Sequence, residues 1–140
     1  MDLFEQNRTT VPKLGKCALY SPAGELHNLG ITIFGELLKN KGFEIHKFGP
    51  NIPDSELISC LLTHRPDALA ISITMAYDLA HLEVVLGKIR QRHELANMII
   101  VVGGYMACKL KSVNQLLGAD IIARDLEQGI NSIMQSIQVE

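Results

Sequence analysis

Short apolar runs alternate with segments of helical periodicity along this chain, and this alternation limits the possible folds more than any other feature. The runs span 16–20, 43–48, 66–74, 97–104 and 118–123, and apolar residues recur every three or four positions after each run. Five strand–helix units predict a parallel sheet, because each helix returns the chain to the same edge of the sheet. We therefore predict helices on both faces of a five-stranded parallel sheet.

The periodic part of the chain defines one domain. Residues 1–14 show no pattern, and we expect them to form a flexible N-terminal tail or linker, with the domain over residues 15–140. Hydrophobic residues make up 47% and charged residues 20%, which is typical of a globular domain. The predicted fold class is α/β, a three-layer (α/β/α) domain of Rossmann-like or flavodoxin-like type.

Composition excludes several kinds of partner. The net charge is −2 and no long basic run occurs, so we expect no nucleic acid to bind this domain. No apolar run reaches the roughly 18 residues that a membrane span needs, so we expect no membrane association. The three cysteines are far apart, which fits neither a disulfide framework nor a zinc site. We expect reduced cysteines and a cytoplasmic protein.

The loops after the first, third and fourth strands are the predicted ligand site, because doubly wound sheets bind ligands beyond the carboxyl ends of their strands. These loops lack the usual phosphate-binding motifs G-x-G-x-x-G and G-x-x-x-x-G-K-[ST], and no G-x-S-x-G is present. A phospho-receiver module would need an aspartate near the end of the third strand, where Ser72 stands.

The three loops carry a recognisable set of residues. They read Glu25-Leu26-His27-Asn28-Leu29-Gly30, then Ser72-Ile73-Thr74, then Gly103-Gly104. In order and spacing they resemble the D-x-H-x-x-G, S-x-L and G-G elements of the cobalamin-binding domain family. Gly30 and Ser72 are separated by 41 residues, and Thr74 and Gly103 by 28, as in that family.

The first loop would hold the metal if this resemblance is followed. In the family, cobalamin releases its own nucleotide base from cobalt and takes a protein histidine instead. The resemblance implies that His27 is this lower axial ligand, through a neutral imidazole nitrogen. Glu25 replaces the usual aspartate and would accept a hydrogen bond from the other ring nitrogen, which orients the ring. Gly30 would leave room for the nucleotide tail.

The other two loops would hold the nucleotide tail. The resemblance implies that Ser72 donates a hydrogen bond to a ring nitrogen of the buried base. Thr74 replaces the usual leucine and would line the same slot. Gly103 and Gly104 would let the backbone approach the tail closely. Of the other histidines, we expect His46, His64 and His93 at the surface. His81 is a second candidate for the metal ligand, because it is expected close to the crevice at the third strand.

Several roles agree with such a domain. The P-x-G-E-x-H-x-x-G form, with Glu25 in place of aspartate, resembles regulatory members of the family, which favours a sensory or regulatory cofactor-binding module over a complete enzyme. The alternatives are a corrinoid component of a methyltransferase, the small subunit of an adenosylcobalamin mutase, a sensor that binds heme through His27, and an interaction module without a ligand. We expect a partner protein, or an upstream domain missing from this chain, to cover the upper face of the cofactor.

Overall fold

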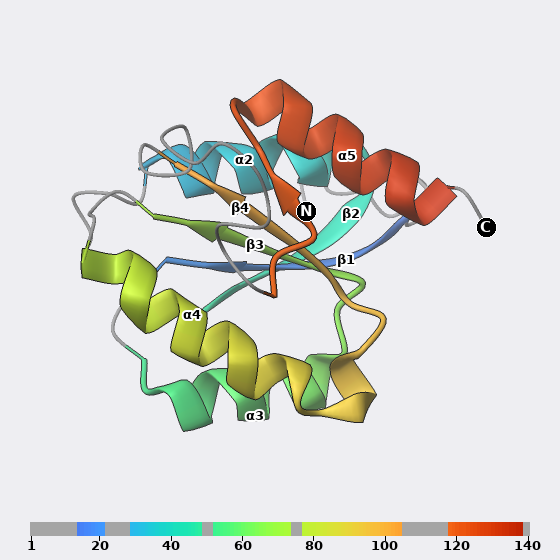
Figure 1. The fold of residues 1–140 in the computed structure, drawn as a ribbon. Coiled ribbons are helices and arrows are strands. Elements are labelled where there is room, and N and C mark those ends of the chain that lie inside the picture. Colours follow the sequence, from blue (N-terminus) through green and yellow to red (C-terminus); the bar gives the residue numbers. More distant parts are fainter. Residues whose placement is uncertain (1–13, 22–28, 49–51, 74–76, 105–117, 139–140) are drawn as a thin grey trace.

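A five-stranded, entirely parallel sheet forms the middle layer of the molecule (Figure 1). The computed structural model describes residues 14–21, 29–48, 52–73, 77–104 and 118–138. The strands are β1 (Gly15–Tyr20), β2 (Phe43–Phe48), β3 (Ala68–Ser72), β4 (Ile99–Gly103) and β5 (Ile121–Ile122). They lie in the order β2-β1-β3-β4-β5 and pair in parallel throughout. This confirms the predicted flavodoxin-like α/β/α fold.

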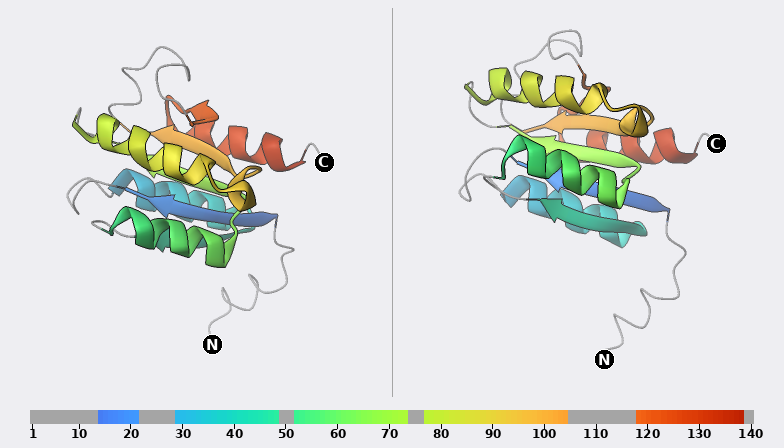
Figure 2. Two further views of the ribbon diagram at one scale, coloured as in Figure 1. Left: turned by 60° about the horizontal axis from the view of Figure 1, so that its bottom comes forward. Right: turned by 90° about the horizontal axis from the view of Figure 1, so that it is seen from below.

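Helices cover both faces of the sheet. They are α2 (Leu29–Asn40), α3 (Asp54–His64), α4 (Tyr77–Arg90) and α5 (Leu126–Gln138), with a short 3-10 helix η2 (His93–Leu95) before β4. Helices α2 and α5 lie on one face and α3 and α4 on the other (Figures 1 and 2). The helix expected over 107–117 lies outside the described residues. No described helix combines the length and apolar character that crossing a bilayer requires.

The central strand β3 is buried along its whole length. Because successive side chains of a strand point to opposite faces, its residues contribute to two separate cores. Leu69 and Ile71 pack with the core beneath α3 and α4, whereas Ala68 and Ala70 pack with the core beneath α2 and α5. This explains why the sequence of β3 is apolar without alternation, as is typical of a strand covered on both sides.

Helix α2 buries part of the stripe that its apolar spacing predicts. Of that stripe, Phe34 and Leu38 are buried as expected, but Ile33 and Leu37 are 41% and 37% exposed, and Ile31 is buried instead. Gly35 lies on the same buried face, and a Cβ added there would lie 2.5 Å from Leu19 Cδ1 of β1. The helix therefore approaches the sheet closely at this glycine.

Cys17 lies in β1, as expected, and is fully buried. Burial raises the pKa of its thiol to about 12. The thiol therefore stays protonated at neutral pH and lacks the thiolate that thiol chemistry needs. Cys17 serves the core beneath α2 and α5 as a small apolar side chain.

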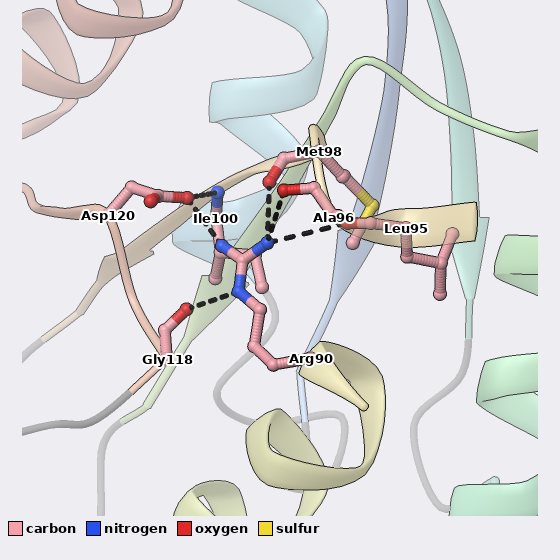
Figure 3. Close-up of polar contacts among 7 residues, drawn as sticks. All are labelled: Arg90, Leu95, Ala96, Met98, Ile100, Gly118 and Asp120. Atoms are coloured by element: carbon pink, nitrogen blue, oxygen red, sulfur yellow. Dashed lines mark hydrogen bonds and ion pairs between the residues drawn. The ribbon is translucent and has the colours of Figure 1, made fainter. Parts of the chain in front are cut away.

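Arg90, at the end of α4, joins several segments at the amino-terminal edge of β4 (Figure 3). Its Nε donates to the Gly118 carbonyl at 3.0 Å and its Nη1 to the Met98 carbonyl at 3.0 Å. Its Nη2 donates to Asp120 Oδ2 at 2.5 Å. The same carboxylate oxygen accepts the Ile100 backbone N–H at 2.8 Å. One guanidinium thus links α4 to the segments before β4 and β5.

Replacing Arg90 with methionine should destabilise the fold by about 2 kcal/mol, because it leaves partly buried carbonyls without donors. Chemical denaturation measures the change. Arg92→Met is the matched control, since Arg92 is exposed and its side chain has no hydrogen bond or ion pair among the described residues. That control should change stability by less than about 0.5 kcal/mol. Equal effects of the two variants would show that the guanidinium contacts contribute nothing.

Candidate functional site

A cavity opens at the carboxyl ends of β3 and β4, on the face of the sheet covered by α2 and α5. Its volume is about 220 Å³. The chain passes from β1 to the edge strand β2 and then returns to β3 on the other side, so the strand order reverses between β1 and β3. The crevice at such a reversal is the usual ligand site of doubly wound sheets. The cavity lies beside this position.

Apolar side chains from the helix and the sheet form the inner end of the cavity. Ile31 and Phe34 come from α2, Ala70 from β3 and Val101 from β4, and Ala123 follows β5. All five belong to the hydrophobic core beneath α2 and α5. The cavity is therefore a gap in that core, open on one side.

Ser72 brings a polar group into this apolar surrounding. It is the last residue of β3, it is only 8% exposed, and it lines the cavity. Its carbonyl accepts a hydrogen bond from Ser21 Oγ at 3.4 Å. Among the residues that the structure describes, its own hydroxyl has no hydrogen-bond partner. Since a buried hydroxyl without a partner is costly, the site is suited to a ligand that carries an acceptor.

The three motif glycines that the structure describes differ in how much room each position leaves for a side chain. A Cβ at Gly30 would meet no atom within 4 Å, so this glycine leaves open space at the cavity. Gly104 has φ +97°, and its Cβ would lie 2.5 Å from the Ile73 carbonyl oxygen. A Cβ at Gly103 would have its nearest neighbours at 3.9 Å. Gly104 is thus required by the packing of its own backbone against the end of β3.

The segment after β5 forms one side of the cavity mouth, and the sequence analysis missed it. Arg124, Asp125 and Leu126 line the cavity and are exposed. The Gln128 N–H donates to Asp125 Oδ1 at 2.8 Å, and the Arg124 N–H donates to Gln128 Oε1 at 2.7 Å. Asp125 therefore caps the start of α5, and Gln128 reaches back to the residue before that cap, an arrangement similar to a capping box. The D-x-x-Q spacing was the signal that could have identified it.

The structure gathers the described motif residues around one cavity: Gly30, Ser72, Gly103 and Gly104 all line it. Glu25, His27 and Thr74 lie outside the described residues. Their predicted roles therefore stay predictions. Within the part of the chain that is described, no group of three or more His, Cys, Asp or Glu side chains is arranged to hold a metal ion.

The other histidines are engaged elsewhere. His81 Nε2 lies 3.1 Å from Asp54 Oδ1, and both residues belong to helices on the opposite face from the cavity. The structure therefore does not bring His81, the second candidate, into this site. His46 and His64 are partly buried rather than fully exposed. His46 Nε2 lies 2.6 Å from Glu44 Oε2, and the rings of the two histidines are tilted by 35° with their centroids 4.4 Å apart. His93 is 94% exposed, as expected.

The cavity fits the nucleotide base that the sequence resemblance implies. An apolar cavity of about 150 Å³ is large enough to take up benzene. This one is larger and is open at one side, and its described lining carries one buried hydroxyl, that of Ser72. An aromatic base with one acceptor nitrogen matches these walls in size and polarity.

Fold and cavity together place the chain in the class of doubly wound α/β domains that take a ligand at the switch point of the sheet. Within that class, the chain belongs to the B12 binding domain family, whose model matches residues 15–133. This confirms the resemblance that the three loop motifs indicate.

Relatives and solved structures agree with this family. Dimethylamine corrinoid protein 3 from Methanosarcina acetivorans is 25% identical over 118 residues, which cover 84% of this chain and 54% of that protein. A cobalamin-binding protein from Desulfitobacterium hafniense DCB-2 has a TM-score of 0.81 at 18% identity, covering 95% of this chain and 63% of that one. A methanol:cobalamin methyltransferase complex from Methanosarcina barkeri has a TM-score of 0.73 at 17% identity, covering 94% and 51%.

These matches have low sequence identity and cover only part of each longer relative. At such low identity the solved structures establish the shared fold. The chain spans about half the length of the corrinoid relatives, with 54% of the dimethylamine corrinoid protein matched.

Replacing Gly104 with alanine should destabilise the protein by about 1–3 kcal/mol, because the backbone is in a conformation that favours glycine and the methyl group would collide with the end of β3. Gly103→Ala is the matched control. Its methyl group would make only ordinary contacts, so its effect should be smaller by about 1 kcal/mol or more. Chemical denaturation compares the two. Equal losses would rule out the close approach at Gly104.

Proposed function

We propose that this chain is a corrinoid-binding domain that holds the nucleotide tail of a cobalamin-type cofactor in the cavity between α2 and α5. The observation that carries the proposal is the cavity itself, an apolar pocket beside the switch point, in which the buried Ser72 hydroxyl has no hydrogen-bond partner among the described residues. Membership of the B12 binding domain family supports the same ligand. Such a cofactor supplies the organometallic chemistry, while the protein binds and orients it.

Each described motif residue has a task in this proposal. Gly30 lines the cavity at the start of α2 and leaves open space there, which admits the tail. The Ser72 hydroxyl donates to an acceptor nitrogen of the base. Gly104 lines the cavity and allows its own backbone to pack against the end of β3.

His27 is proposed as the lower axial ligand and Glu25 as its hydrogen-bond acceptor. Support comes from the E-x-H-x-x-G spacing and from the position of Gly30, its last residue, at the cavity. A carboxylate that accepts the second imidazole N–H fixes the tautomer and increases the basicity of the ligand nitrogen. Binding through this histidine leaves the nucleotide base free to enter the cavity.

Incubation with hydroxocobalamin, followed by desalting, should leave a corrinoid absorption spectrum on the protein. His27→Ala should shift that spectrum, because cobalt loses its protein nitrogen ligand, and should weaken retention. His93→Ala is the matched control, since that side chain is 94% exposed and should leave the spectrum unchanged. A bound spectrum identical in wild type and His27→Ala would contradict axial ligation by His27.

A parallel incubation with hemin tests whether the protein binds heme instead of a corrinoid. A retained heme band with no retained corrinoid would replace the proposal with a heme sensor that uses the same loop. Retention of neither would favour an interaction module without a ligand.

For the biological role, we favour a corrinoid carrier that works with a partner methyltransferase. The support is the similarity to a corrinoid protein of Methanosarcina and to a methanol:cobalamin methyltransferase complex. The second candidate is a sensory or regulatory module, which the Glu25 form of the motif favours. The two differ in whether the bound cofactor exchanges methyl groups or only reports its own state to a partner.

The carrier role predicts methyl-group exchange. With the bound cofactor reduced to cobalt(I), a methyl donor and its methyltransferase should convert the spectrum to that of the methylated cofactor within minutes. The His27→Ala variant loaded with the same cofactor serves as the comparison. Failure to methylate, together with a change in association with another protein when the cofactor is bound or photolysed, would favour the sensory role.

A further inference from the structure

The inner end of the cavity is almost wholly apolar. Ile31 and Phe34 are each 5% exposed, and Ala70 and Val101 are each 2% exposed. Ala70 and Val101 lie side by side in the register of β3 and β4, so they form a continuous floor. Ile31 and Phe34 of α2 lie opposite this floor, across the cavity. None of these side chains offers a hydrogen bond to a ligand.

Backbone groups at this end of the sheet are also engaged. The Ile73 N–H donates to the Gly103 carbonyl at 2.9 Å, and the Ala123 N–H donates to the Val102 carbonyl at 2.8 Å. These bonds continue the parallel ladder beyond the last residues of the strands. In the described lining, the Ser72 hydroxyl is therefore the single buried side-chain group available for a hydrogen bond.

The charged residues of the lining lie at the solvent side. Arg124 and Asp125 are exposed, and one oxygen of the Asp125 carboxylate already accepts the Gln128 N–H. They are positioned at the mouth, where α5 begins, rather than at the apolar floor. A base inserted to the floor would leave the charged groups at the solvent side behind and, among the described side chains, would have Ser72 as its one polar partner.

This polarity distinguishes between kinds of nucleotide base. A benzimidazole attached through one nitrogen keeps one ring nitrogen as an acceptor, which one hydroxyl satisfies. An adenine attached in the same way keeps an exocyclic amino group and additional ring nitrogens. Each polar group that is buried without a partner reduces affinity, by about 5- to 100-fold on the usual scale.

We propose that the cavity selects corrinoids whose lower base is an apolar ring system of the benzimidazole type over corrinoids whose lower base is a purine. This inference rests on the proposed function, because it requires that the nucleotide tail occupies the cavity. It assigns Ser72 the recognition of the single ring nitrogen, and Val101 and Ala70 the exclusion of bases with more polar groups.

The test measures dissociation constants of four probes on the full chain: cobalamin, its adenine analogue, its p-cresol analogue, which has no ring nitrogen, and cobinamide, which has no tail. The adenine analogue should bind about 10- to 100-fold more weakly than cobalamin. Ser72→Ala should weaken the binding of cobalamin by about 5-fold and leave the affinity for the p-cresol analogue unchanged. The effect of Ser72→Ala is measured for each corrinoid against the wild-type protein. The free energy needed to release the base from cobalt is the same for both proteins and therefore cancels.

A wall variant tests the exclusion directly. Val101→Thr keeps the shape of the side chain and adds a hydroxyl to the floor. It should therefore raise the affinity for the adenine analogue relative to that for cobalamin by about 5-fold. Val102→Thr is the matched control. Val102 neighbours Val101 and is fully buried, but it packs in the core on the opposite face, so this change should leave the ratio as in wild type.

The outcomes separate the two proposals. Equal affinity for cobalamin and its adenine analogue, or a ratio that Val101→Thr and Val102→Thr change alike, would overturn the selectivity while corrinoid binding stands. Cobinamide bound as tightly as cobalamin would show that the tail does not use the cavity, which overturns the inference. Retention of no probe would overturn the proposed function and the inference with it.

Discussion

The parallel pairing of β3 with β1 and β4 is the constraint on which the site depends. It places the ends of β3 and β4 side by side, with Ser72 opposite Gly103 in the register. The ladder continues through the bond from the Ile73 N–H to the Gly103 carbonyl, which brings Gly104 against the end of β3. Because Gly104 has no side chain, its backbone packs closely against the end of β3. The cavity floor and the position of the Ser72 hydroxyl both follow from this pairing.

The order of strands and helices could be predicted from the sequence because each type of element has its own apolar period. The orientation of α2 could be predicted only in part. The predicted stripe contains Phe34 and Leu38, which are buried, but also Ile33 and Leu37, which are exposed in the structure. Gly35 lies on the buried face, in close contact with Leu19. A glycine adds nothing to a hydrophobic pattern, so this signal was invisible to periodicity.

The site could be predicted only in part for a similar reason. Gly30, Ser72, Gly103 and Gly104 come together because they follow strands whose carboxyl ends share one edge. The apolar walls, such as Phe34 and Val101, could not be distinguished from ordinary core residues, since they belong to the same cluster. The segment after β5 was missed although its strand was predicted and ends at the same edge, because the motif residues pointed only to the loops after the first, third and fourth strands. The motif identifies the polar and small residues of the site, whereas its apolar walls can be identified only from the packing in the structure.

The cavity and the core beneath α2 and α5 are physically one structure. Phe34, Ala70 and Val101 each pack in the core on one side and line the cavity on the other. A cavity in a core costs stability because its lining loses packing contacts. A ligand that fills it restores those contacts and stabilises the folded state by mass action. Under the proposed function, the same apolar lining limits which base can enter, since a polar base would restore packing but bury groups without partners. In the proposed complex, stability and the choice of base therefore depend on the same few side chains.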